Sequence, residues 1–172
     1  MSVKRKAFDD FYRGSKDRCY RALLATVGDV ALTDDLLAEA YARAWQRWSD
    51  VARHPAPEAW VVRVALNLHH DNWRSRKLAG RLRPSPPVAP PELDLDVDLL
   101  RALRALPDRQ REVVVLRILL DNTNDQVAAT LGIAPATVSV HLHRALGALR
   151  LTVSDPYEAT SLVDEPLEEF IP

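Results

Sequence analysis

The sequence predicts an all-α protein in which two small helical domains are joined by a proline-rich linker. Apolar residues recur at helical spacing on both sides of this linker, and no segment shows the alternation of a half-buried strand. Residues 84–98 hold five of the twelve prolines, which prevents a helix over most of that segment. We therefore expect helical domains at 1–83 and 99–153, an acidic linker at 84–98 and an acidic, disordered tail at 154–172.

The first domain is expected to contain three main helices and a short additional one. The first helix runs from about Ala7 to Val27, and Gly14 weakens its middle. The second runs from Thr33 to Trp48, because Thr33 can act as an N-cap ahead of two acidic residues. The loop Ser49–Pro57 contains two prolines and separates it from the third helix, Glu58 to about Leu78.

The second domain is expected to end in a helix-turn-helix. Helices at 98–106 and 107–120 precede this motif, and residues 124–131 form its first amphipathic helix. Gly132 can adopt the left-handed conformation that ends a helix, and Pro135 suits the first turn of the next one. In such a motif the second helix fits the DNA major groove. The pattern therefore predicts a protein that reads nucleic acid.

The charge distribution supports this prediction, although the net charge of −1 and the pI of about 6.5 do not. Residues 1–83 carry a net charge of +6 and residues 99–153 carry +3. The linker carries −4 and the tail carries −6, with no basic residue in either. Both expected domains are thus basic, and the overall pI is low because the acidic linker and tail offset their charge.

The sequence predicts no disulfide, no metal site, no enzyme and no membrane-spanning segment. Cys19 is the one cysteine, which excludes an intramolecular disulfide and fits a reducing cytoplasm. The pairs His69–His70 and His141/His143 have no further ligands nearby, so we expect no metal site. The acidic residues of the second helix lack an adjacent nucleophile or Gly-rich loop, so we expect no enzyme, no catalytic residue and no cofactor. No apolar run could cross a membrane and no signal peptide is recognisable, which predicts a cytoplasmic protein.

The third helix carries a continuous polar and mostly cationic stripe on one side. Its members are spaced i, i+4, i+7, i+11 and i+14: Arg63, Asn67, His70, Arg74 and Lys77. Such a stripe suits a phosphate backbone, and Trp73 beside it could stack on an unpaired base. The alternative is a solvated face that keeps the helix soluble. A separate helix-turn-helix in the same chain favours the nucleic-acid interpretation.

Three segments resemble the conserved regions of bacterial sigma factors. Residues 33–48 are similar to the signature of region 2, and residues 58–77 resemble its promoter-melting, −10-reading helix. Residues 103–117 and the helix-turn-helix resemble region 4. The two regions in this order resemble the small extracytoplasmic-function (ECF) type, of the actinobacterial branch, over about residues 8–151.

The resemblance implies a function. Such a protein binds core RNA polymerase through the β′ clamp helices and the β flap, and directs it to a promoter. It is often held by an anti-sigma factor. By position, the polymerase contacts would be Asp35, Glu39 and Tyr41. The −10 element would meet the cationic stripe Arg63, Asn67, His70, Arg74 and Lys77, with the Ser49–Pro57 loop receiving a flipped base. The −35 major groove would meet Thr137, Ser139, Val140, His143 and Arg144.

The chain departs from the family pattern at four positions. Ala38 stands where glutamine is usual, Ala134 replaces the usual Ser/Thr helix cap, and Ser139 and His141 stand where basic residues are common. We therefore expect weak or pH-sensitive −35 binding. The alternative function is a helix-turn-helix transcriptional regulator that does not bind core polymerase. For the tail, three roles stay open: a passive segment, an acidic mimic that folds back on the basic domains, or a degradation or docking tag.

Overall fold

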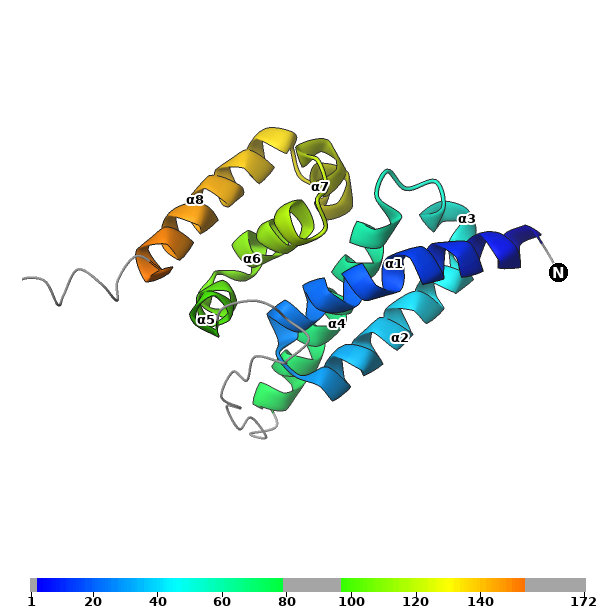
Figure 1. Cartoon of the computed structure of the whole chain (residues 1–172), viewed down its shortest axis with the longest axis horizontal. Coiled ribbons are helices and arrows are strands. Elements are labelled where there is room, and N and C mark those ends of the chain that lie inside the picture. The colour runs from blue at the N-terminus through cyan, green and yellow to red at the C-terminus, as the bar shows by residue number, and fades with distance from the viewer. Residues whose placement is uncertain (1–2, 79–96, 154–172) are drawn as a thin grey trace, which may run out of the picture.

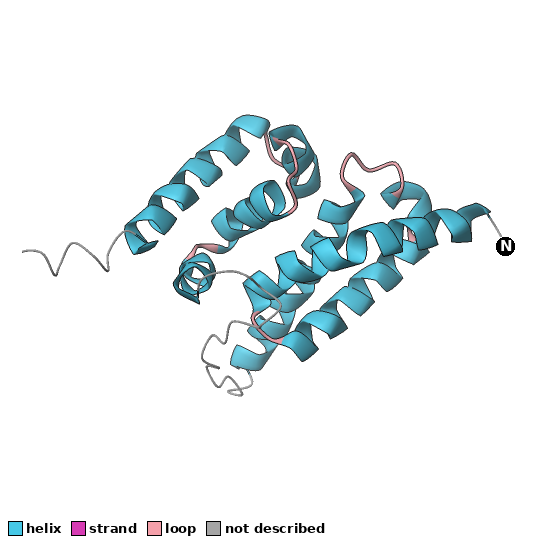
Figure 2. Cartoon of the chain, in the orientation of Figure 1, coloured by secondary structure: helices cyan, strands magenta, loops and turns pink. Residues whose placement is uncertain are grey.

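The computed structural model describes residues 3–78 and 97–153, and every secondary-structure element in these two ranges is helical (Figures 1 and 2). The N-terminal module comprises α1 (Val3–Val27), α2 (Val30–Gln46), α3 (Trp48–Val51) and α4 (Pro57–Leu78). The C-terminal module comprises α5 (Val97–Ala105), α6 (Asp108–Val114), the π-helical segment η1 (Val115–Leu119), α7 (Asn124–Leu131) and α8 (Pro135–Val153). The expected tail, and the expected linker except for its last two residues, lie outside the described residues.

The start of α2 corrects the expected N-cap. Gly28 adopts a left-handed φ of 74° after α1, and Asp29 then caps α2 by accepting a hydrogen bond from the Leu32 amide at 2.8 Å. Thr33 lies one turn inside the helix, where its buried hydroxyl donates to the Asp29 carbonyl oxygen at 2.7 Å. The prediction that Thr33 is the N-cap is therefore wrong, because another good cap precedes it by one turn. Gly14 does not interrupt α1.

The helix-turn-helix follows the sequence prediction closely. Thr123 and Gln126 form a capping box at the start of α7, with the Gln126 amide donating to Thr123 Oγ1 at 3.2 Å. Gly132 ends α7 in the left-handed conformation with a φ of 65°, and α8 begins at Pro135. Ile133 packs against the core between the two helices. Local backbone preferences are sufficient to specify this turn.

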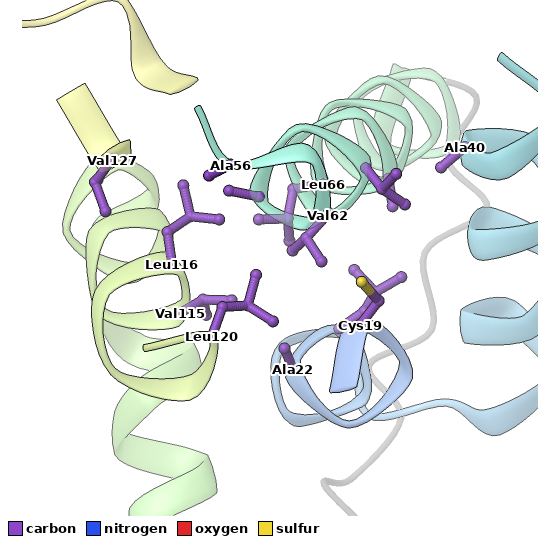
Figure 3. Packing of buried hydrophobic residues seen from close by; sticks show 14 of the residues in the cluster. Cys19, Ala22, Ala40, Ala56, Val62, Leu66, Val115, Leu116, Leu120 and Val127 are labelled. Atoms are coloured by element: carbon purple, nitrogen blue, oxygen red, sulfur yellow. The ribbon is translucent and has the colours of Figure 1, made fainter. Parts of the chain in front are cut away.

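The two modules share a hydrophobic core, which the sequence pattern did not predict. Figure 3 shows Val115, Leu116 and Leu120 of the C-terminal module facing Leu66 of α4 and Ala22 of α1. Each of the five is less than 5% exposed. In Figure 1, α1 and α4 lie beside the C-terminal module, and α2 lies on the far side of α1. The packing of α1 against both α5 and η1 agrees with that arrangement.

A polar contact closes one end of the same interface. The Arg104 guanidinium of α5 lies against the C-terminus of α1, and its Nε donates to the Ala25 carbonyl oxygen at 3.3 Å. Burial lowers the pKa of Arg104, but a cation is favourable beside the carbonyl end of a helix. A Cβ atom on Gly28 would lie only 2.5 Å from Arg104 Cζ. Gly28 is thus needed for its backbone conformation and for the close approach of Arg104.

We expect Gly28→Ala to destabilise the chain by at least about 1–2 kcal/mol, because it strains a left-handed residue and displaces Arg104. Gly14→Ala, in the middle of α1, is the matched control. A Cβ there meets nothing within 4 Å, so it should stabilise the chain by about 0.5–1 kcal/mol. Urea unfolding measures both effects. Equal stabilisation by the two changes would contradict this account.

Candidate nucleic-acid interface

The exposed side of α8 brings together the five residues predicted to read the −35 element. All of them are exposed, whereas Val138, Ala145 and Leu149 on the opposite side are buried. Val140 is a large apolar side chain that is 47% exposed. An apolar group at this place can contact a thymine methyl group, and Arg144 beside it can bind a phosphate or a base edge. The five exposed residues are Thr137, Ser139, Val140, His143 and Arg144.

Two residues that the sequence analysis missed hold this helix in place. Asn124, the first residue of α7, donates from Nδ2 to Ser139 Oγ at 2.9 Å. Arg117 of η1 in turn donates from Nε to Asn124 Oδ1 at 3.1 Å. Ser139 is therefore tied to the first helix of the motif as well as being exposed. The only sequence signal for this chain of contacts is the pair of polar residues at the start of α7, which also suits an ordinary helix N-terminus.

The packing of the two modules leaves some residues of the cationic stripe of α4 exposed and brings others into contact with the C-terminal module. Asn67 and Arg74 are exposed, but a guanidinium nitrogen of Arg63 donates to the Thr130 carbonyl oxygen of α7. His70 Nε2 lies 3.9 Å from a carboxylate oxygen of Asp108 in α6. Lys77 lies in the last turn of α4, but its side chain falls outside the described residues. Part of the predicted −10 surface therefore contacts the C-terminal module in this structure.

The loop predicted to receive a flipped base also contacts the C-terminal module. Gln126 of α7 donates from Nε2 to the Pro55 carbonyl oxygen at 3.1 Å. Next to it, Arg18 of α1 forms an ion pair with Glu58 at 2.6 Å. Burial raises the pKa of Glu58, and Arg18 opposes that shift. The loop is thus held between α1 and α7.

The predicted polymerase-binding residues of α2 separate into two groups. Asp35 and Glu39 lie on its exposed side, where Glu39 pairs with Arg43 at 2.8 Å. Tyr41 instead lies in the core and is 6% exposed. This position argues against the predicted direct contact of Tyr41 with polymerase. The apolar spacing that marks α2 as amphipathic could have placed Tyr41 inside.

The hydroxyl of Tyr41 has an internal partner. It lies 2.8 Å from Ser15 Oγ, which donates its own proton to the Phe11 carbonyl oxygen at 2.7 Å. Burial raises the pKa of Tyr41. Burial also raises the pKa of the neighbouring Cys19 thiol to about 11, so this thiol stays protonated near neutral pH. The group is a structural link between α1 and α2.

Within residues 3–78 and 97–153, no group of three or more His, Cys, Asp or Glu side chains is arranged to hold a metal ion. None of the described helices combines the length and the apolar character needed to cross a membrane.

These surfaces and the fold define a helical DNA-binding protein with two regions, and comparison with known proteins identifies its family. Residues 11–79 match the family "Sigma-70 region 2", and residues 96–149 match "Sigma-70, region 4". The chain is 35% identical to the RNA polymerase sigma-E factor of Streptomyces coelicolor over 148 residues, which cover 83% of this chain and 84% of the relative. It is also 35% identical to the ECF RNA polymerase sigma factor SigL of Mycobacterium tuberculosis, with coverage of 79% and 82%.

Solved structures show the same fold. The sigma factor RpoE in complex with the anti-sigma factor NepR, from Bartonella quintana, superposes with a TM-score of 0.74 at 21% identity. That match covers 87% of this chain and 98% of the other. CnrH in complex with the cytosolic domain of CnrY gives a TM-score of 0.63 at 22% identity, with 88% and 91% covered.

The chain therefore belongs to the ECF family of RNA polymerase sigma factors. This result confirms the resemblance drawn from residues 33–48, 58–77 and 103–117. It also confirms the sigma factor function over a regulator that does not bind core polymerase, because both regions are present in relatives that are themselves sigma factors. Proteins of this family are transcription initiation factors that bind core polymerase and promoter DNA.

The buried position of Tyr41 generates a test. We expect Ser15→Ala to cost about 1–3 kcal/mol of stability, because the buried Tyr41 hydroxyl loses its partner. In a Tyr41→Phe background the same change should cost less, since no hydroxyl is left unpaired. Glu39→Ala on the exposed side of α2 is the control and should change stability by less than about 1 kcal/mol. Urea unfolding gives all the values, and an equal cost of Ser15→Ala in both backgrounds would refute the link.

Proposed function

We propose that this chain contacts core RNA polymerase through the exposed side of α2, the −10 element through α4 and the −35 element through α8. The observation that carries the proposal is that each region presents a predicted contact face to solvent. Asp35 and Glu39 do so on α2, and the five predicted −35 residues do so on α8. Because the two faces belong to different modules, one chain can hold polymerase and duplex DNA at the same time.

Binding of the −10 strand by the whole α4 stripe requires the two modules to separate. Arg63 can reach a phosphate only after its contact with the Thr130 carbonyl breaks, and His70 only after it leaves Asp108. Asn67 and Arg74 are exposed without any rearrangement. We infer that the packed arrangement is the form of the free protein and that docking on polymerase favours the separated one.

The remaining assignments follow from the family. We propose an anti-sigma factor as a regulatory partner, supported by the two structural neighbours, whose solved complexes each contain a second protein. It would block transcription by covering the α2 face or by stabilising the packed modules. We also propose that the chain acts in the cytoplasm, where core polymerase works, and that it contributes binding without catalysis of its own.

Reversing charge on the α2 face should abolish transcription while preserving the fold. We expect Asp35→Lys and Glu39→Lys each to weaken co-purification with core polymerase and to reduce run-off transcription, because both carboxylates are exposed. Asp10→Lys is the matched control, since it reverses another exposed helical carboxylate on α1. Circular dichroism checks the fold. Full activity of both α2 variants would exclude this face as the polymerase contact.

Arg144 should contribute to DNA affinity through its charge. A duplex selected from a random pool by the native chain serves as the probe. We expect Arg144→Ala to weaken binding by about 1–3 kcal/mol and, if the contact is to a phosphate, to lower the salt slope by about one. Arg101→Ala is the control, because Arg101 is an exposed arginine of α5 that already pairs with Asp98 at 2.5 Å. Equal losses for the two variants, measured by fluorescence anisotropy, would contradict the assignment of α8.

A further inference from the structure

An apolar groove lies on the C-terminal module, beyond the residues assigned to the −35 element. Its volume is about 290 Å³, and its walls come from α5, α6, η1 and α8. Of the nine lining residues, eight are leucine, isoleucine or valine, and Arg150 is the one that carries a charge. Ile118 in the groove is 48% exposed. A concave surface lined almost wholly by apolar side chains, with one charged group at its edge, is the usual form of a ligand site.

The chain itself supplies a segment that can reach this groove. Leu149 and Arg150 of α8 line it, and α8 ends three residues later at Val153. Figure 1 shows this end of α8 beside α5, and the two helices pack against each other. Residues 154–172 follow directly. Their 19 residues can span roughly 60 Å at full extension, so the distance back to the groove is well within reach.

The sequence of this segment matches the groove in apolar character. Leu167, Phe170 and Ile171 are spaced i, i+3 and i+4, which is the spacing of residues that share one face when a segment is helical. Pro166 immediately before them is a residue type favoured in the first turn of a helix. Three large apolar side chains on one face suit a groove walled by leucine, isoleucine and valine.

The charges also match. Residues 154–172 contain six acidic residues and no basic one, whereas the C-terminal module carries a net charge of +3. Glu168 and Glu169 lie within the apolar motif, and Arg150 supplies a cation in the groove. The positive electrostatic potential of the C-terminal module therefore favours binding of an acidic segment over binding of a basic or neutral one.

We propose that residues 167–171 dock in the groove between α5, η1 and α8, with Phe170 and Ile171 beside Ile118 and the adjacent glutamates near Arg150. The acidic end of the chain then covers the exposed apolar face of its own C-terminal module. This docking depends on none of the polymerase or promoter contacts proposed above.

The isoleucine content of the chain allows a direct test. The sequence has three isoleucines: Ile118 in the groove, Ile171 in the terminal segment and Ile133 between α7 and α8. In the full-length chain labelled at isoleucine δ1 methyl groups, we expect a nuclear Overhauser effect between Ile118 and Ile171. Deleting residues 154–172 should shift the Ile118 methyl resonance and leave that of Ile133 unchanged, which also confirms that the module remains folded.

Point variants separate specific docking from a general effect of the tail. Phe170→Ser should reproduce the shift of Ile118 seen on deletion, whereas Leu162→Ser, in the same segment but outside the motif, should not. Arg150→Glu should weaken the Ile118–Ile171 contact by opposing Glu168 and Glu169. Arg150 lines the groove and the other two positions lie in the terminal segment, and Ile133 again reports on folding.

Three outcomes would overturn the proposal. An Ile118 resonance that does not respond to deletion of residues 154–172 would show that the segment does not occupy the groove. A response that disappears on dilution of the protein would assign the groove to a second copy of the chain. An Ile118 resonance that shifts only when core polymerase is added would assign the groove to polymerase.

Discussion

The packing of η1 and Leu120 against α1 and α4 is the contact on which the arrangement of this molecule depends. Val115, Leu116 and Leu120 are at most 4% exposed, and they meet residues of the N-terminal module. Burying each such side chain contributes about 1.5–3 kcal/mol. Arg104 adds a cation against the end of α1 at the edge of this interface. The relative position of α4 and α8 is therefore set by a hydrophobic contact between modules.

That contact competes with the proposed function of α4. The residues of α4 that would bind the −10 strand include Arg63, which in the packed form bonds to the Thr130 carbonyl. The observed affinity for a promoter then equals the affinity of the separated form multiplied by the fraction of molecules in which the modules are apart. Any protein that binds the packed form more tightly lowers that fraction further, and under the proposed function polymerase raises it by binding the separated form. The exposed face of α8 does not take part in this competition.

The sequence was sufficient for features that depend on neighbouring residues alone. Gly132, Pro135 and the exposed side of α8 follow from local backbone preference and from a spacing of 3.6 residues. Thr33 was misassigned because Asp29 is an equally good cap one turn earlier, and Gly28 ends α1 just in front of it. The contact between modules was not predictable, because helical periodicity indicates that a face is buried without indicating what buries it. For the same reason, the sequence does not predict the contact of Arg63 with the Thr130 carbonyl oxygen. It does not predict the hydrogen bond between Asn124 and Ser139 either.

The five-residue π-helical segment η1 has a consequence for the length of the chain. Within it the hydrogen bond runs from the Leu120 amide to the Val115 carbonyl oxygen, at 3.1 Å, over one more residue than in an α-helix. Removing a single residue between Val115 and Leu120 would restore ordinary winding with an i, i+4 bond between them, so Leu120 would keep nearly the same direction relative to α6. The side chains between these two residues would turn instead, because the angle between successive residues differs in the two kinds of helix. The extra residue of η1 therefore changes the directions of the side chains inside this turn and leaves the Leu120 contact between the modules in place.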